Sequence, residues 1–239
     1  MTPASADTRR PSPAPDWSLY LVTDPDLGGG RDAVRPLVSA AVSGGVSVVQ
    51  LRDKHLDPAG FTARAAELAA ALRPTGVPLF LNDRVDIAAE LGLHLHIGQD
   101  DMDYVGARAT LPDTSMIGLS VDRHEQIDEL QRLVGLGVRP PDVLGLGPVH
   151  LTDTKTNTGR ALGVTGPGSV SELAAHALTL GIPSVAIGGV GTGNATALAH
   201  TPVAGLCVVS AIMAAGSTSA ATTAARQLLS LFTTSKEAS

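Results

Sequence analysis

Short apolar runs alternate with longer amphipathic runs through most of the chain, which predicts strands separated by helices. The apolar runs are rich in leucine, isoleucine and valine, as buried parallel strands are. They fall at residues 18–23, 46–51, 78–81, 93–96, 116–119, 142–146, 184–187 and 205–209. Between them the spacing is helical, as in residues 58–72, where Phe61, Ala65, Leu68 and Leu72 recur on one helix face. Eight strands, each followed by a helix, predict an α/β fold consisting of a single (β/α)8 TIM barrel.

Polar residues collect just after the predicted strands and not just before them. They are Arg52 and Lys54, Asn82 and Asp83, Gln99 to Asp101, Ser120 and Asp122, Thr152, Thr154 and Lys155, Gly188 and Gly189, and Ser210. Barrel enzymes place their active sites at the carboxyl ends of the strands, so this asymmetry predicts a site there. An open doubly wound sheet is the alternative fold. The run GGVGTGN at residues 188–194 lacks the third glycine of a dinucleotide-binding fingerprint, which argues against that alternative.

The stretch VSVVQLRDK, residues 46–54, carries the strongest local charge pattern. Strand alternation places Gln50, Arg52 and Lys54 on one face, in line with Val46 and Val48. Two cations and an amide at a barrel mouth are costly to bury unless an anion meets them, which indicates a negatively charged ligand. A solvated strand end remains the alternative for this stretch taken alone.

Two carboxylates follow neighbouring predicted strands. Asp83 and Asp101 would meet at one mouth with Arg52, Lys54 and Lys155. This is the pattern expected where Mg²⁺ bridges protein and a polyphosphate, because Mg²⁺ takes one or two carboxylates and completes its shell with water and phosphate. Each carboxylate alone could instead cap the helix that follows it.

His94 and His96 form an H-x-H pair on the predicted fourth strand. A transition-metal site is one interpretation. Hydrogen-bonded interior histidines are the preferred one, because few other histidines are well placed.

Composition bounds the class of protein. The chain has 239 residues, 44% of them apolar and 17% charged, with a formal net charge of −6. These values predict a globular protein and argue against a general nucleic-acid or anionic-membrane surface. The single cysteine, Cys207, excludes an intrachain disulfide and is predicted to be a buried small apolar residue.

The two ends of the chain differ from the middle in composition. Residues 1–16 are rich in proline, alanine and serine and have no apolar run, so we expect a disordered extension without a secretory signal or a membrane span. The barrel is predicted to occupy residues 17–232, followed by a frayed tail at 233–239. We expect a cytoplasmic protein, with homo-oligomer formation left open.

Eight sequence blocks, taken together, resemble the thiamine-phosphate synthase family. In chain order they read LYLVTD, GGVSVVQLRDK, LNDRVDIA, HIGQDDM, IGLSV, GLGPVHLTDTK, IPSVAIGGV and VVSAI, between residues 19 and 212. The resemblance implies an enzyme that joins hydroxymethylpyrimidine diphosphate to hydroxyethylthiazole phosphate, or its carboxylated form. The products would be thiamine monophosphate and diphosphate. It also implies a dissociative mechanism through a pyrimidine carbocation.

The resemblance further implies a role for each matching residue. Pyrimidine diphosphate would be held by Gln50, Leu51, Arg52, Asp53, Lys54, Asn82, Ser120 and Lys155. Thiazole phosphate would be held by Thr152, Asp153, Thr154, Gly189, Val209 and Ser210. Mg²⁺ would be held by Asp83 and Asp101. The catalytic residues would be Arg52, Lys54, Lys155 and Ser120.

The chain departs from the family pattern at two places. It reads LGLHLHIGQ where the family commonly reads LGADGVHLGQ, and His150 and Leu151 replace the usual aromatic residue and proline. A thiazole tautomerase and a non-catalytic regulator with the same barrel are the rival functions. A tautomerase would not need the predicted diphosphate-binding residues, and a regulator would be marked by their loss, whereas all of them are present.

Overall fold

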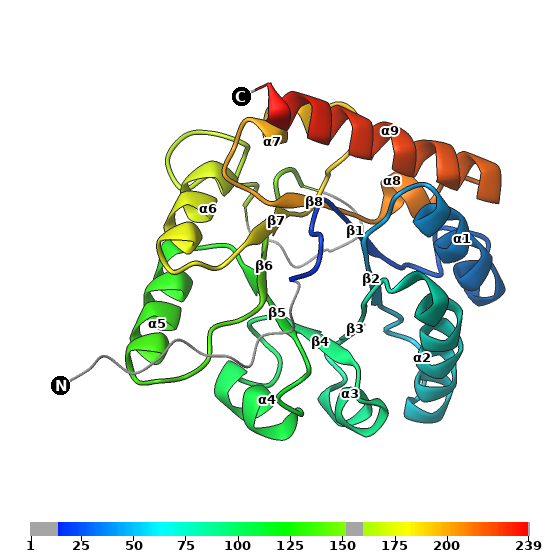
Figure 1. The fold of residues 1–239 in the computed structure, drawn as a ribbon, viewed down its shortest axis with the longest axis horizontal. Coiled ribbons are helices and arrows are strands. Elements are labelled where there is room, and N and C mark those ends of the chain that lie inside the picture. The colour runs from blue at the N-terminus through cyan, green and yellow to red at the C-terminus, as the bar shows by residue number, and fades with distance from the viewer. Residues whose placement is uncertain (1–13, 152–159, 239) are drawn as a thin grey trace.

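Eight parallel strands close into a barrel in the computed structural model, which describes residues 14–151 and 160–238. The strands are β1 (Leu19–Val22), β2 (Val48–Leu51), β3 (Leu79–Asn82), β4 (His94–Ile97), β5 (Ile117–Val121), β6 (Val143–Leu146), β7 (Ser184–Ala186) and β8 (Gly205–Val208). Each strand pairs with the next, and β8 pairs with β1 through Leu206 and Leu19 (Figure 1). All eight predicted strands and the barrel are confirmed.

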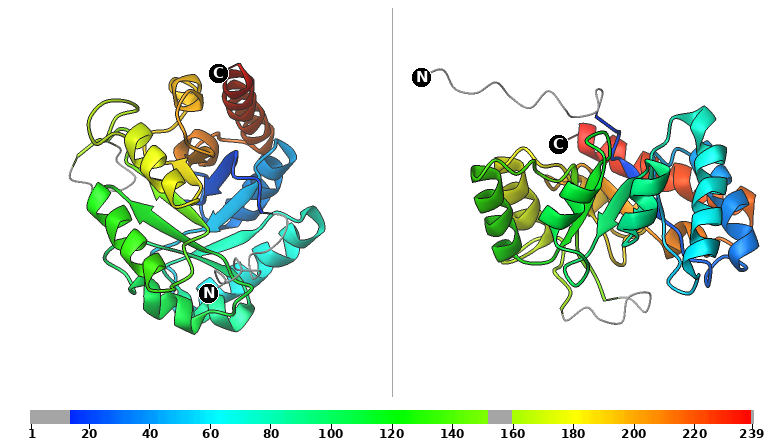
Figure 2. Two further views of the ribbon diagram at one scale, coloured as in Figure 1. Left: turned by 60° about the vertical axis from the view of Figure 1, so that its left-hand side comes forward. Right: turned by 90° about the horizontal axis from the view of Figure 1, so that it is seen from below.

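Helices form the outer layer around the strands (Figure 2). They are α1 (Arg31–Ser43), α2 (Pro58–Leu72), η1 (Arg73–Thr75), α3 (Val85–Leu91), α4 (Tyr104–Thr110), α5 (His124–Gly135), α6 (Val170–Thr179), α7 (Ala195–Ala199), α8 (Ser210–Met213) and α9 (Thr218–Glu237). The helix predicted at residues 58–72 is α2. It begins at Asp57, whose Oδ1 accepts a hydrogen bond from the Gly60 N–H at 2.7 Å. Within the described residues no helix is both long and apolar enough to cross a membrane.

Strand alternation separates two apolar clusters. The larger cluster lies between strands and helices, and Leu51 and Leu81 belong to it. The smaller cluster fills the barrel interior with Tyr20, Val48, Phe80 and other buried side chains, among them the predicted buried Cys207. The barrel is therefore a packed core that opens only at its ends.

The start of β2 differs from the sequence prediction. Val46 packs in the outer cluster and does not continue the inner row of Val48. Gly45 has a φ of 108°, and the Val46 N–H donates to the Ala41 carbonyl at 3.1 Å. The backbone at Val46 is therefore still part of the turn that ends α1, and strand alternation starts only at Val48.

The predicted frayed tail at 233–239 is also corrected. Helix α9 continues through Glu237. The Lys236 Nζ donates to the carbonyls of Thr201 and Val203 at 2.9 and 2.8 Å and lies 5.4 Å from the centroid of the Phe232 ring. These contacts join the last turn of α9 to the loop before β8, which explains why the helix does not end earlier.

Both histidines of the H-x-H pair lie on the inner face of β4 and have protein partners. His96 Nε2 is 3.2 Å from Ser120 Oγ. His94 Nδ1 accepts from the Met116 N–H at 3.1 Å, and its ring packs 5.1 Å from that of Phe80. The prediction of hydrogen-bonded interior histidines is confirmed. Burial lowers the pKa of His94 to about 4.

His94 should make the fold sensitive to acid. An unfolded histidine has a pKa of about 6.5, so between about pH 6.5 and 4 only the unfolded state takes up this proton. The stabilisation is complete above that window and is lost as the pH falls, by about 3 kcal/mol in total. We expect His94→Asn, which retains an acceptor for the Met116 N–H, to flatten the pH dependence of the free energy of unfolding in this window. Urea unfolding at several pH values measures it, with His55→Asn, an exposed histidine, as the control; an unchanged slope in His94→Asn would refute the assignment.

Candidate active site at the carboxyl ends of the strands

The inner rows of β2 to β5 end in polar side chains at one end of the barrel. These are Gln50, Asn82, His96 and Ser120. Gln50 is only 4% exposed, and its Nε2 donates to the Tyr20 hydroxyl at 3.0 Å. The mouth therefore has a floor of polar donors and acceptors directly above the apolar interior.

A glycine makes room for one of these side chains. A Cβ atom at position 118 on β5 would lie 2.4 Å from His96 Nδ1, well inside contact distance. Gly118 therefore lets the His96 ring lie across β5 and reach Ser120. The main chain of Ser120 is held as well, because its carbonyl accepts from Gln99 Nε2 at 2.6 Å.

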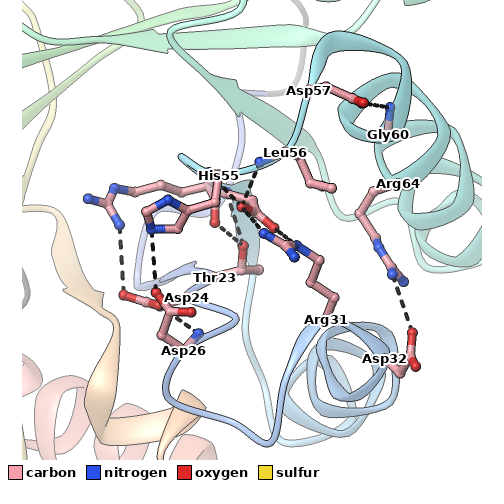
Figure 3. A network of polar contacts seen from close by, with 12 residues as sticks. Thr23, Asp24, Asp26, Arg31, Asp32, His55, Leu56, Asp57, Gly60 and Arg64 are labelled. Carbon is pink, nitrogen blue, oxygen red and sulfur yellow. Dashed lines mark hydrogen bonds and ion pairs between the residues drawn. The ribbon is translucent and has the colours of Figure 1, made fainter.

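Arg52 follows β2 and is held at its backbone by β1. The Thr23 hydroxyl accepts from the Arg52 N–H at 3.0 Å and donates to the Arg52 carbonyl at 3.2 Å. The Arg52 Nη1 lies 3.7 Å from Asp24 Oδ2, and the Arg52 side chain is 20% exposed. Figure 3 shows Thr23 and Asp24 close together after β1. Thr23 and Asp24 thus fix a cation at the mouth. Neither Thr23 nor Asp24 was predicted to belong to the site, although both are polar residues that directly follow a strand, as the other predicted site residues do.

The Asp53 side chain lies away from the mouth, beside α1. Arg31 Nε and Nη2 donate to its two oxygens at 2.7 and 3.3 Å. Its Oδ1 also accepts from the N–H groups of His55 and Leu56 at 2.9 and 3.2 Å (Figure 3). Burial opposes ionisation of Asp53, but the hydrogen bonds from Arg31 and the backbone outweigh it and lower the pKa. Asp53 therefore shapes the loop after β2.

The Leu51 side chain lies outside the mouth. It is 1% exposed and belongs to the cluster between strands and helices. Of the residues from 50 to 54 that the family resemblance places around the diphosphate, Leu51 and Asp53 do not present side chains to the mouth. The stretch brings Gln50, Arg52 and Lys54 to this end, as alternation predicted, and Lys54 is exposed.

Asp83 and Asp101 are brought together from the loops after β3 and β4. Burial and the adjacent carboxylate of Asp101 raise the pKa of Asp83 to about 6, against the opposing effects of Asn82 and Lys54. Asp83 has a φ of 61°, and Asp101 Oδ2 accepts from the Gly98 N–H at 2.8 Å. Two carboxylates in contact repel each other unless a proton or a cation lies between them. The donor set fits a hard divalent cation that takes its remaining ligands from water or a ligand phosphate.

The loops after β7 and β8 form the other side of the mouth. Gly188 and Gly189 both have positive φ, 87° and 67°, and a Cβ atom on Gly188 would lie 2.6 Å from Pro148 Cβ. Asn194 fixes this turn, because its side chain donates to the Gly189 carbonyl at 2.9 Å and accepts from the Gly191 N–H at 3.0 Å. Val209 ends the inner row of β8, and Ser210 is exposed at the start of α8.

Four predicted site residues belong to the stretch outside the described ranges. They are Thr152, Asp153, Thr154 and Lys155. Their roles in binding thiazole phosphate and diphosphate stay predictions. The described residues before them end at Leu151, whose side chain is 64% exposed.

Comparison with known proteins identifies relatives along nearly the whole chain. A family model described as thiamine monophosphate synthase matches residues 19–212. The thiamine-phosphate synthase of Azorhizobium caulinodans is 40% identical over 222 residues, which cover 92% of this chain and 97% of that protein. A solved structure, a thiamine phosphate pyrophosphorylase from Pyrococcus furiosus, aligns with a TM-score of 0.75 at 27% identity over 93% of this chain and 98% of that one.

A larger type of relative is more similar in sequence. The thiamine biosynthesis multifunctional protein ThiED of Corynebacterium efficiens is 52% identical over 222 residues, which cover 91% of this chain and 29% of that protein. This chain therefore spans less than a third of the multifunctional relatives that it matches. The family match covers all eight strands and both carboxylates of the mouth. The chain belongs to the thiamine monophosphate synthase family.

Proposed function

We propose that the protein is a thiamine-phosphate synthase, a transferase of thiamine biosynthesis. It would couple hydroxymethylpyrimidine diphosphate with hydroxyethylthiazole phosphate, or its carboxylated form, to give thiamine monophosphate and diphosphate. The observation that carries the proposal is the contact between Asp83 and Asp101, near Lys54 from the loop after β2, in a chain of this family. We expect it to act in the cytoplasm on small phosphorylated molecules, without nucleic-acid or membrane partners.

The diphosphate would bind between the two charged groups of the mouth. Arg52 and Lys54 from the loop after β2 would contact its oxygens, with Lys155 as a third cation, and Gln50 and Asn82 would orient the pyrimidine. Asp83 and Asp101 would hold Mg²⁺, which when bound supplies positive charge to the leaving diphosphate.

The mouth residues would assist departure of diphosphate and would not attack the substrate. The pyrimidine methylene C–O bond breaks with its electron pair leaving on diphosphate, and the thiazole nitrogen then forms the new C–N bond to that carbon. Arg52 and Lys54 stabilise the charge that develops on the leaving group, and Ser120 would lie near the bridging oxygen. Cys207 offers no nucleophile, since it is fully buried in β8 and burial raises its pKa.

The thiazole phosphate would bind on the opposite side of the mouth. Gly189, Val209 and Ser210 end β7 and β8 there, and Thr152 to Thr154 are the residues that the family resemblance adds. The two substrates would thus approach from opposite strands, which positions the thiazole nitrogen toward the reacting carbon.

Product formation tests the proposal directly. The protein is mixed with both substrates in Mg²⁺ and then with a chelator, and thiamine monophosphate and diphosphate are measured together. We expect both products in equal amounts, with the rate falling to background in chelator and returning with Mg²⁺. A folded protein that binds either substrate but forms no product would instead favour the tautomerase or the regulator.

A further inference from the structure

Two histidines meet on the outer layer of the barrel, between α5 and α6. His124 Nδ1 lies 3.2 Å from His176 Nδ1, and the ring centroids are 5.4 Å apart with an angle of 27° between the planes. The ring centroids are much farther apart than the two Nδ1 atoms. The rings therefore meet at their Nδ1 edges and do not stack face to face. The two Nδ1 atoms therefore point at a common position.

A carboxylate stands at the far nitrogen of each ring. His124 Nε2 lies 3.8 Å from Glu172 Oε2 on α6, and His176 Nε2 lies 3.6 Å from Asp128 Oδ1 on α5. Each helix thus contributes one histidine and one carboxylate, four positions apart, which places both on one helix face. Glu172 is itself fixed, because Oε2 accepts from the Gly168 N–H at 2.8 Å.

The neighbouring carboxylates favour protons on the two Nε2 atoms. A carboxylate beside one imidazole nitrogen favours a proton on that nitrogen and leaves the lone pair on the other, as in many metal-bound histidines. Both Nδ1 lone pairs are then directed at each other across 3.2 Å. This contact is repulsive unless a proton or a cation lies between the two nitrogens.

We propose that His124 and His176 bind one divalent transition-metal ion of the Zn²⁺, Ni²⁺ or Cu²⁺ class through their Nδ1 atoms. Imidazole nitrogens lie about 2.0 to 2.1 Å from Zn²⁺, so two of them at a tetrahedral ion are about 3.3 Å apart. The observed separation of 3.2 Å matches this distance, and each ring has to turn by about 35° so that its Nδ1 lone pair meets the ion beside the line joining the two nitrogens. The side chains of His124 and His176 are 39% and 23% exposed, so the ion has access from solvent.

The site offers two protein nitrogens and completes its shell with water. Among the described residues, no group of three or more histidine, cysteine, aspartate or glutamate side chains is arranged to hold a metal ion. A pair of ligands predicts weak, exchangeable binding with a Kd in the micromolar range. Imidazole ligands disfavour Mg²⁺, so this site and the carboxylates of the mouth select different ions. The proposal does not depend on the proposed function.

Metal titration of the tag-free, metal-stripped full chain tests the proposal. Calorimetry with Zn²⁺ is carried out in excess Mg²⁺, which occupies the carboxylates of the mouth. We expect one equivalent of Zn²⁺ to bind, with at least tenfold weaker binding in His124→Gln and in His176→Gln. With Cu²⁺, electron paramagnetic resonance should show two coupled nitrogens in the parent. Asp128→Asn should retain the stoichiometry and weaken binding several-fold, because it orients His176 and is not a ligand.

The control is His55→Gln. His55 is an exposed histidine whose Nε2 lies 3.8 Å from Asp26 Oδ2, so it has a carboxylate neighbour but no second histidine. It should bind Zn²⁺ as the parent does, and circular dichroism without metal should show that all variants are folded. Equal binding in parent and His124→Gln, or no binding by the parent, would overturn the proposal and leave a shared proton as the only bridge between the rings.

Discussion

Asp83→Asn is expected to lower the rate of thiamine monophosphate formation by about 100-fold or more. The change removes one of the two carboxylates that we propose hold Mg²⁺, and a neutral amide binds this ion much more weakly. Asparagine is the appropriate replacement because residue 83 has a φ of 61°, a conformation that asparagine tolerates and alanine does not. A loss of activity in Asp83→Asn therefore cannot be attributed to backbone strain.

The same substitution should leave the fold at least as stable as the parent in the absence of metal. Burial and the contact with Asp101 disfavour the charge of Asp83, so a neutral side chain there relieves repulsion. The measurements are turnover as a function of Mg²⁺ concentration and urea unfolding in chelator. Asp86→Asn removes a carboxylate from an exposed position of α3, close in sequence, and should change neither. Parental activity and Mg²⁺ dependence in Asp83→Asn would reject the metal assignment.

The barrel and its mouth could be predicted because their signals are local. Apolar runs mark the strands, strand alternation places Gln50 and Arg52 on one face, and the polar residues after strands mark one end. Asp83 and Asp101 could be paired from sequence because the carboxyl ends of neighbouring parallel strands lie side by side. Alternation alone also separates the side chain of Leu51 from those of Gln50 and Arg52, and the contact of Leu51 with the diphosphate stays a prediction.

The remaining features depend on contacts between distant parts of the chain. Asp53 lies beside a strand end, yet its partner Arg31 comes from α1, and no local pattern indicates that pairing. The contact between His124 and His176 joins positions 52 residues apart. Lys236 likewise extends α9 only because the loop before β8 offers it carbonyls. Packing decides these cases, and periodicity carries no information about them.

Asp53→Asn is expected to raise the KM for hydroxymethylpyrimidine diphosphate by about 10- to 100-fold while changing kcat much less. The Asp53 carboxylate, whose side chain is 4% exposed, joins Arg31 to the backbone of the loop that carries Arg52 and Lys54. An amide has only one oxygen and cannot accept both hydrogen bonds from Arg31. Arg52 and Lys54 therefore lose their fixed position before substrate binds. The free energy of unfolding should fall by about 1 to 3 kcal/mol, because a buried partner of Arg31 is lost.

Arg31→Lys tests the contact between Arg31 and Asp53 by changing the arginine. Lysine keeps the charge but not the two-point geometry of the guanidinium, so we expect a smaller rise in KM than in Asp53→Asn. The matched control is Arg64→Gln on α2. Arg64 is a neighbouring arginine whose Nη2 lies 3.7 Å from Asp32 Oδ1 (Figure 3), and its Nη1 donates to Glu67 Oε2 at 2.7 Å. This substitution should leave KM unchanged.

The division between KM and kcat separates a positioning role from a catalytic one. If Asp53 only fixes the loop, saturating pyrimidine diphosphate restores most of the rate. The Mg²⁺ dependence then stays parental, because Asp83 and Asp101 lie in the loops after β3 and β4. If Asp53 touched the reacting atoms, kcat would fall at saturation and Arg31→Lys would not reproduce the effect. A large loss of kcat in Asp53→Asn with KM unchanged would therefore mean that this carboxylate acts in the mouth. That result would contradict the structure, in which its hydrogen bonds with Arg31, His55 and Leu56 hold it away from the mouth.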